Sequence, residues 1–199
     1  MKKLGILFTA VLLFAFIGCK NNNKEMDSVN DMTDTINMDA RDNHSLSTAP
    51  RTISVTLGSK SNSTARGEAQ FTERDGKVTF EAKFNGLEPG THAIHLHEKA
   101  DCSAADASSA GGRWNPTLQK HGKWGDGEGY HKGDIGNLEA DNEGNASITM
   151  ETDEWCIGCG DENKDILGKS IIVHEGADDF VSQPTGDAGG RVACGGVIE

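Results

Sequence analysis

The chain has 199 residues, of which 35% are hydrophobic and 25% charged, and its formal net charge is −12. It lacks the basic stripe that nucleic-acid-binding surfaces carry, so the composition argues against a nucleic-acid partner. Acidity of this size is consistent with solubility outside the cytoplasm.

The first 19 residues have the features of an export signal rather than of a folded element. The segment begins with two lysines after Met1, continues with a mostly apolar run over 4–17 and ends in Gly18-Cys19. It is too short and wrongly flanked for a membrane span. The letters FIGC at 16–19 resemble a bacterial lipobox. This predicts a lipidated Cys19 that anchors the protein in the cell envelope, in the periplasm or at the outer membrane. A plain cleaved signal is the alternative.

Residues 20–50 are rich in Asn, Asp, Ser and Met, contain no aromatic residue and show little periodicity. Such a segment cannot bury enough surface to offset the entropy cost of ordering, so we expect a flexible tether that includes His44. The rest of the chain, residues 51–199, suits one domain with a single core.

From residue 51 onward, short alternating segments separated by turn residues predict eight β-strands. They are expected at residues 52–57, 65–73, 77–84, 91–98, 135–140, 146–152, 170–174 and 191–198. The turn signals at 74–76 and 141–144 each predict a hairpin. Eight strands with Gly-rich turns predict an all-β fold, an eight-stranded antiparallel Greek-key barrel or sandwich of immunoglobulin-like type. Three connections, 99–133, 153–169 and 176–190, are long enough to suggest functional loops.

The histidines follow an order that predicts two metal sites. Six of the seven lie in this domain: His92, His95, His97, His121, His131 and His174. Side chains alternate along a strand, so His95 and His97 project from the same face and can bind one ion. Imidazole ligands favour copper or zinc over calcium or magnesium. His174 ends a later strand and could be a third ligand of this ion, whereas His92 faces the other side and is interpreted as structural.

A second cluster combines nitrogen and oxygen ligands. His121, His131 and Asp134 follow one another in and just after the first long loop, and two imidazoles with a carboxylate are a reasonable zinc set.

Four cysteines follow Cys19, and an even number in an exported chain favours disulfides. Cys156 and Cys159 could form a local loop disulfide, although a redox or metal CxxC site is the alternative. A local disulfide would leave Cys102 to pair with Cys194 and so pin the first long loop against the last strand.

In these elements the chain resembles the bacterial exported copper–zinc superoxide dismutases. The matching runs, in order, are GTHAIHLHE (90–98), DC (101–102), AGG (110–112), NP (115–116), HG (121–122), HKGDI (131–135), GKSIIVH (168–174), DD (178–179) and GDAGGRVACG (186–195). Together they extend over essentially all of 51–199.

The resemblance implies an oxidoreductase that converts superoxide to oxygen and hydrogen peroxide by copper redox cycling, with copper and zinc as cofactors. The implied ligands are His95, His97 and His174 for copper, and His121, His131 and Asp134 for zinc. Asp178 would orient ligands of both sites, and Arg191 would attract superoxide. Cys102 and Cys194 would form the family disulfide. The resemblance leaves the oligomeric state open, with a homodimer as one alternative.

Arg113 departs from the family pattern, which has at this position the histidine that bridges the two metals. Arginine stays protonated and offers no lone pair. We therefore expect weakened metal occupancy, of zinc especially. In an active dismutase Arg113 would swing outward and leave a water in its place. Two alternatives stay open: a copper-handling lipoprotein with little turnover, and a structural relative whose metals serve only stability.

Overall fold

The computed structural model describes residues 49–199. The predicted signal segment 1–19 with its lipidated Cys19, and the tether up to residue 48 with His44, lie outside the described residues. The described part contains eight strands and one short 3-10 helix. They are β1 (Arg51–Ser59), β2 (Arg66–Arg74), β3 (Lys77–Asn85), β4 (Gly90–His97), η1 (Ser108–Ala110), β5 (Asp134–Ala140), β6 (Ala146–Thr152), β7 (Ser170–His174) and β8 (Arg191–Gly196). None of the helical structure described is long and apolar enough to cross a membrane.

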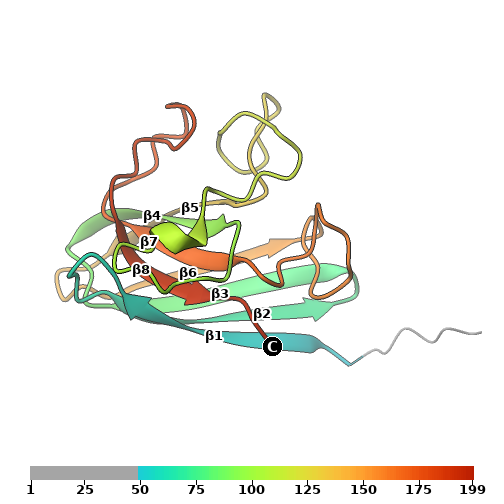
Figure 1. Ribbon diagram of the computed structural model, residues 1–199, viewed down its shortest axis with the longest axis horizontal. Helices are drawn as coiled ribbons and strands as arrows, with labels where there is room; N and C mark the ends of the chain where they lie inside the picture. Colours follow the sequence, from blue (N-terminus) through green and yellow to red (C-terminus); the bar gives the residue numbers. More distant parts are fainter. Residues whose placement is uncertain (1–48) are drawn as a thin grey trace, which may run out of the picture. The chain divides into compact units, whose positions relative to one another are not determined.

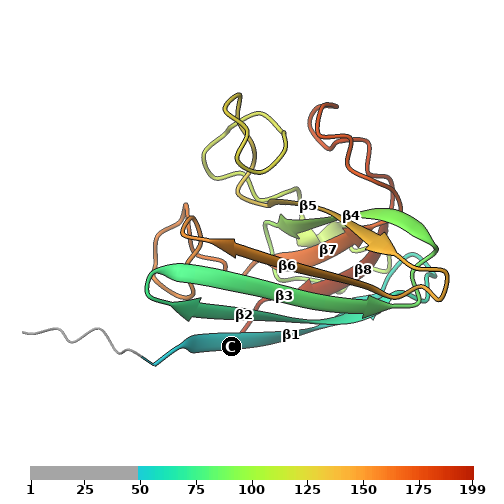
Figure 2. The ribbon, with the colours of Figure 1, turned by 180° about the vertical axis from the view of Figure 1, so that it is seen from behind.

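All eight predicted strands form, and the all-β antiparallel fold class is confirmed. The strands follow the order β5-β4-β7-β8-β1-β2-β3-β6, and every strand pair is antiparallel. In Figures 1 and 2, β1, β2, β3 and β6 form one layer, while β4, β5, β7 and β8 form the other. Connections that cross between the layers give the arrangement its Greek-key character.

The alternating pattern of the strands places one face of each layer in a common core. In β1, Ile53, Val55 and Leu57 are buried while the residues between them are exposed. At one end of this core the rings of Phe71 and Phe80 lie 4.8 Å apart. Burial of these apolar side chains is the main favourable contribution to folding, at about 25 cal/mol per Å² removed from water.

The two predicted hairpins have different outcomes. Arg74 pairs with Lys77, and the two residues between them have φ of 52° and 77°, as a two-residue hairpin turn requires. The hairpin expected around 141–144 is wrong as a pairing. The turn forms, with a bond from the Asp141 amide to the Asn145 carbonyl, but β5 and β6 lie at opposite edges of the eight-stranded order. The turn therefore carries the chain from one layer to the other.

Strand β4 is buried on both faces, which positions the site. Ile94 and Leu96 point into the core. His95 and His97 point the other way and are nevertheless 0% and 3% exposed. Two long loops lie on this side, loop L1 (residues 98–133) and loop L2 (residues 175–190). Both views show parts of L1 and L2 standing out from the β4, β5 and β7 layer.

Two disulfides form among the described residues. Cys102–Cys194 joins L1 to β8 across 92 residues, and Cys156–Cys159 closes a local turn in the connection between β6 and β7. The first places the start of L1 beside the strand that begins with Arg191. Its sulfurs belong to a small apolar cluster with Ala107, Ala110 and Ile172, so that L1 is packed as well as cross-linked.

Candidate metal centre

Neighbouring strands bring three histidines together. His95 and His97 come from β4, and His174 ends β7, which pairs with β4 through Ile94–Val173 and His97–Ser170. One ring nitrogen of each histidine lies within 4.8 Å of the other two. The pairing of β4 with β5 shifts register just before His95, and the pairing of β7 with β8 shifts register just before His174. Such irregularities re-aim side chains, and here they lie directly beside two of the three rings.

Each of the three rings is oriented through its other nitrogen. His95 Nε2 donates to Asp178 Oδ2 at 2.7 Å. His97 Nδ1 donates to the Gly111 carbonyl at 3.0 Å, and His174 Nδ1 donates to the Gly189 carbonyl at 3.3 Å. The remaining nitrogens are His95 Nδ1, His97 Nε2 and His174 Nε2. All three are buried and have no hydrogen-bond partner within residues 49–199.

Burial keeps these imidazoles neutral, which is the state that binds metal. It lowers the pKa of His95 to about 4, although the hydrogen bond to Asp178 opposes the shift. It also lowers the pKa of His97 to about 3 and that of His174 to about 2. Three buried acceptor nitrogens without partners are costly unless something binds them. This donor set, three neutral imidazoles, fits copper.

The second predicted cluster also forms. His121 and His131 from L1 and Asp134 at the start of β5 place their ligand atoms within 4.8 Å of one another. His131 Nδ1 has no hydrogen-bond partner in the described chain and lies 3.5 Å from Asp134 Oδ1. The His131 amide donates to Asp134 Oδ2 at 2.8 Å, which fixes the carboxylate next to its own turn.

Arg113 points into this second cluster and does not swing outward. Its backbone pairs with His97 in an isolated antiparallel bridge beside β4. The side chain is only 4% exposed. Its Nη1 contacts His121 Nδ1 at 2.6 Å, Asp134 Oδ1 at 2.7 Å and Asp178 Oδ2 at 3.2 Å. The orientation follows from charge, since a buried guanidinium requires paired carboxylates and two are in reach.

Asp178 connects the two clusters. Its Oδ2 accepts from His95, and its Oδ1 accepts from His121 Nε2 at 2.8 Å and from the Phe180 amide at 2.7 Å. Burial opposes ionisation of Asp178, but the hydrogen bonds from His121 and His95 outweigh it and lower the pKa of the carboxyl well below its usual range. Asn137 on β5 fixes the Asp178 backbone, donating to its carbonyl and accepting from its amide.

The neighbouring carboxylates raise the pKa of His121, whereas His121 lowers the pKa of the carboxyl groups. Burial lowers the pKa of His121, but hydrogen bonds with Asp134 and Asp178 outweigh burial and raise it to about 9. The pKa of Asp134 is lowered for the same reason: burial is outweighed by His121, His131 and the nearby Arg113 charge. The second cluster is therefore a network of compensated charges.

Arg191 lies beside the first cluster. Its Nη1 donates to the Ala107 carbonyl at 2.7 Å, and its Nη2 donates to the Gly111 carbonyl at 2.8 Å. Gly111 is also the acceptor for His97. The guanidinium is thus held by two carbonyls of L1 within reach of the histidines, and it is partly exposed. His92 joins neither cluster. Its ring nitrogens lie 2.8 and 2.7 Å from the carbonyl oxygens of His174 and Glu88.

Several positioning groups have no sequence signal. Gln183 in L2 accepts from the His121 amide and donates to the His121 carbonyl, both at 2.9 Å. The Thr185 carbonyl accepts from Arg113 Nη2 at 3.0 Å. Asn137 and Gly111 act through similar contacts. Backbone carbonyls and single amide side chains belong to no metal-binding spacing, so sequence reasoning could not find them.

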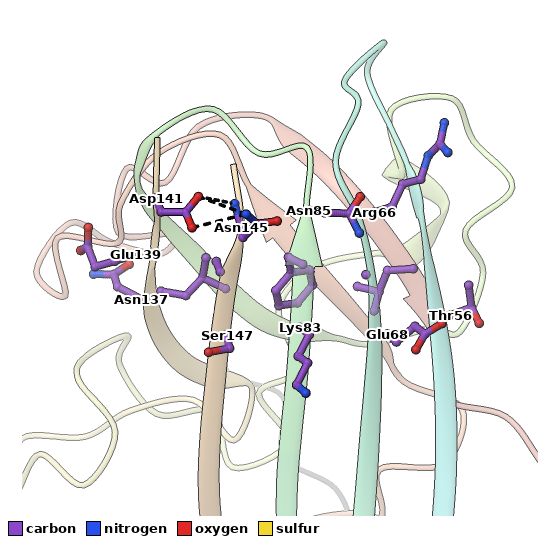
Figure 3. Close-up of a pocket in the computed structure, with 15 residues that line it drawn as sticks. Thr56, Arg66, Glu68, Lys83, Asn85, Asn137, Glu139, Asp141, Asn145 and Ser147 are labelled. Carbon is purple, nitrogen blue, oxygen red and sulfur yellow. Dashed lines mark hydrogen bonds between the residues drawn. The ribbon is translucent and has the colours of Figure 1, made fainter. Parts of the chain in front are cut away.

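A hollow of about 1050 Å³ lies apart from the histidines. Figure 3 shows its polar residues, with Asn145 hydrogen-bonded to Asp141 at the rim. Its lining comes from β1, β2, β3, β5 and β6 and includes no residue of either cluster.

Comparisons with known proteins agree with this geometry. Residues 65–198 match the family model described as "Copper/zinc superoxide dismutase (SODC)". The chain is 34% identical over 132 residues to superoxide dismutase (Cu-Zn) 2 of Aquifex aeolicus (strain VF5), which is 65% of this chain and 77% of that protein. It is 34% identical over 139 residues to the copper chaperone for superoxide dismutase of Homo sapiens, covering 66% of this chain but only 48% of the chaperone.

Solved structures show the same fold. The crystal structure of a SOD-like protein from Bacillus subtilis matches with a TM-score of 0.66 and 31% identity, over 75% of this chain and 100% of that chain. The relatives thus carry the names of dismutase, dismutase-like protein and copper chaperone. The family model covers more than half of the chain, and this chain belongs to the copper/zinc superoxide dismutase family.

Proposed function

We propose that this protein is a copper-dependent superoxide dismutase. The observation that carries the proposal is the convergence of His95 Nδ1, His97 Nε2 and His174 Nε2, which are buried, neutral and without partners in the described domain. These three residues would hold the copper ion. When bound, copper supplies the one-electron chemistry that oxidises one superoxide to oxygen and reduces the next to hydrogen peroxide.

The chain's own residues prepare this site. Asp178 holds the His95 ring with Nδ1 turned toward the other two histidines. A hydrogen-bonded carboxylate of this kind fixes ring orientation and raises the basicity of the ligand. Arg191, which is partly exposed, offers a fixed positive charge beside the three histidines. It would attract the anion in spite of the net charge of −12, because the local field decides the approach at short range.

We assign no step to zinc. His121, His131 and Asp134 would be its ligands by resemblance to the family, but the guanidinium of Arg113 lies against two of them. Nothing in the proposed chemistry at the three histidines requires a second metal ion.

A copper-handling role with little turnover is the second candidate. The similarity to a copper chaperone favours it. So does Arg113, which stands where the resemblance places the bridging histidine of the family. In this role the three imidazoles would bind copper and later release it, without repeated oxidation and reduction of the ion.

The test compares copper-loaded wild-type protein with two variants in a direct assay of superoxide decay. Wild-type protein should bind about one copper ion per chain and consume superoxide, and Arg113→His should consume it faster. His97→Ala should weaken copper binding by at least roughly 100-fold, since it removes a ligand rather than an outer contact.

The outcomes separate the candidates. Copper binding at the three histidines without superoxide consumption would favour the copper-handling role. If Arg113→His leaves the rate and the zinc content unaltered, the role assigned to position 113 is wrong.

A further inference from the structure

The second cluster has no lone pair left for a metal at His121. A neutral imidazole has one N–H and one acceptor nitrogen. If His121 is neutral, its Nε2 donates to Asp178 and its Nδ1 accepts from Arg113 Nη1. If His121 is protonated, both nitrogens carry hydrogen, and Nδ1 donates to Asp134 at 3.0 Å. In neither state can Nδ1 bind a zinc ion.

Arg113 also competes with zinc for space and charge. Zinc binds nitrogen and oxygen ligands at about 2.0–2.2 Å. Arg113 Nη1 lies 2.6 Å from His121 Nδ1 and 2.7 Å from Asp134 Oδ1, which is only slightly farther. A divalent cation bound by both atoms would thus lie next to a buried guanidinium that stays charged. The two cations exclude each other.

The guanidinium joins the segments that meet at this cluster. Arg113 belongs to L1 and contacts His121 of the same loop, Asp134 at the start of β5, and Asp178 in L2. Its Nη2 adds a bond to the Thr185 carbonyl, also in L2. One buried cation therefore fastens both long loops to the strand layer beside the three histidines.

We propose that Arg113 is a built-in replacement for the zinc ion of this family. Its guanidinium neutralises Asp134 and Asp178, holds L1 and L2 in place, and keeps the second cluster closed to zinc. The protein is then a copper-only member whose second cation is part of the chain. This inference does not depend on dismutase turnover, because zinc uptake and thermal stability are measured without superoxide.

The experiment measures zinc uptake by equilibrium dialysis on copper-loaded protein, so that the three histidines are already occupied. Wild-type protein should take up no zinc above background. Arg113→Ala frees His121, His131 and Asp134, and should take up about one zinc ion per chain. Adding Asp134→Asn to that variant should abolish the uptake. Arg66→Ala is the matched control, since it removes a guanidinium that lines the separate hollow of Figure 3, and its zinc uptake should equal that of wild type.

Thermal unfolding gives a second readout. Without zinc, Arg113→Ala leaves two buried carboxylates without their guanidinium partner, and its Tm should fall by about 10 °C. Zinc should restore most of this loss, while the Tm of wild-type protein should not respond to zinc.

Two results would overturn the proposal. The first is uptake of zinc by the wild-type protein that disappears in Asp134→Asn, a comparison that remains available if Arg113→Ala does not fold. The second is a folded Arg113→Ala that takes up no zinc, which would mean that Arg113 does not occupy a zinc site.

Discussion

At Gly186 the backbone of L2 passes too close to Asp178 for any side chain to fit between them. A Cβ at this position would lie 2.0 Å from Asp178 Oδ1 and 2.7 Å from His121 Nε2. The residue also has a φ of 62°, which side chains rarely adopt. The carboxylate that links the two clusters can therefore take its place only beside a glycine.

Gly186→Ala should displace Asp178 and with it the His95 ring. We expect a loss of about 3 kcal/mol or more in the free energy of unfolding, because buried hydrogen bonds to a charged group break. Gly168→Ala is the matched control. It has a φ of 79° but nothing within 4 Å of the added Cβ, so it should lose only about 1–2 kcal/mol from backbone strain.

Urea unfolding of the metal-free proteins measures both losses, and competition with a copper chelator measures retention of the metal. Equal losses in the two variants would mean that the close approach at Gly186 is relaxed without cost.

At the scale of elements, L1 depends on its disulfide to β8. Cys102–Cys194 closes a separation of 92 residues, whereas Cys156–Cys159 closes a separation of 3. A cross-link stabilises mainly by restricting the unfolded chain, and the effect grows with the length of the closed loop.

Removing both cysteines of the long link, as Cys102→Ala with Cys194→Ala, should therefore cost about 4–5 kcal/mol of unfolding free energy, against about 2 kcal/mol for Cys156→Ala with Cys159→Ala. Denaturant titration of the two double variants provides the comparison. Similar losses would show that L1 is held by its packing and not by the cross-link.

Strand positions could be predicted from alternation, and the partners of the strands only in part. The hairpin at 74–76 was predictable because Asp75 and Gly76 are residue types that tolerate the positive φ that a two-residue hairpin turn requires, and both adopt it. The turn at 141–144 was also predicted, but turn residues indicate only that the chain reverses direction. They do not determine which strand the following segment pairs with. Strand β6 pairs with β3, far earlier in the chain, because its apolar face completes the other layer.

The convergence of His95, His97 and His174 was predictable from residue type and strand face, while the direction of Arg113 was not. The sequence establishes that arginine is charged and has no lone pair. Its inward direction depends on Asp178 and Thr185, which are 65 and 72 residues away. Such long-range compensation of charge has no local pattern, so the sequence alone could not decide between an outward and an inward side chain.

At the scale of the whole molecule, the charge near the candidate copper site and the net charge of the protein have opposite effects on an approaching anion. The net charge of −12 repels an anion, while Arg191 presents a guanidinium next to the three histidines. Salt screens both effects beyond a Debye length of about 10 Å at 0.1 M. The response of the rate to ionic strength therefore reports which of the two charges governs the approach.

If the copper-loaded protein consumes superoxide as proposed, Arg191→Ala should lower the rate at low salt by about tenfold or more, and the rate should no longer fall as salt is added. Arg66→Ala is the control, since Arg66 lines the separate hollow of Figure 3. Stopped-flow superoxide decay over a range of NaCl concentrations measures both variants. An unchanged salt profile in Arg191→Ala would remove the steering role.

The Gly111 carbonyl oxygen is shared by two side chains of the candidate copper site. It accepts from His97 Nδ1 and from Arg191 Nη2, so a single peptide unit aims both the ligand and the guiding charge. Groups that share a hydrogen-bond partner show non-additive mutational energies. The effects of substitutions at positions 97 and 191 are therefore coupled through a backbone atom. A substitution at one position changes which substitutions the other can accept.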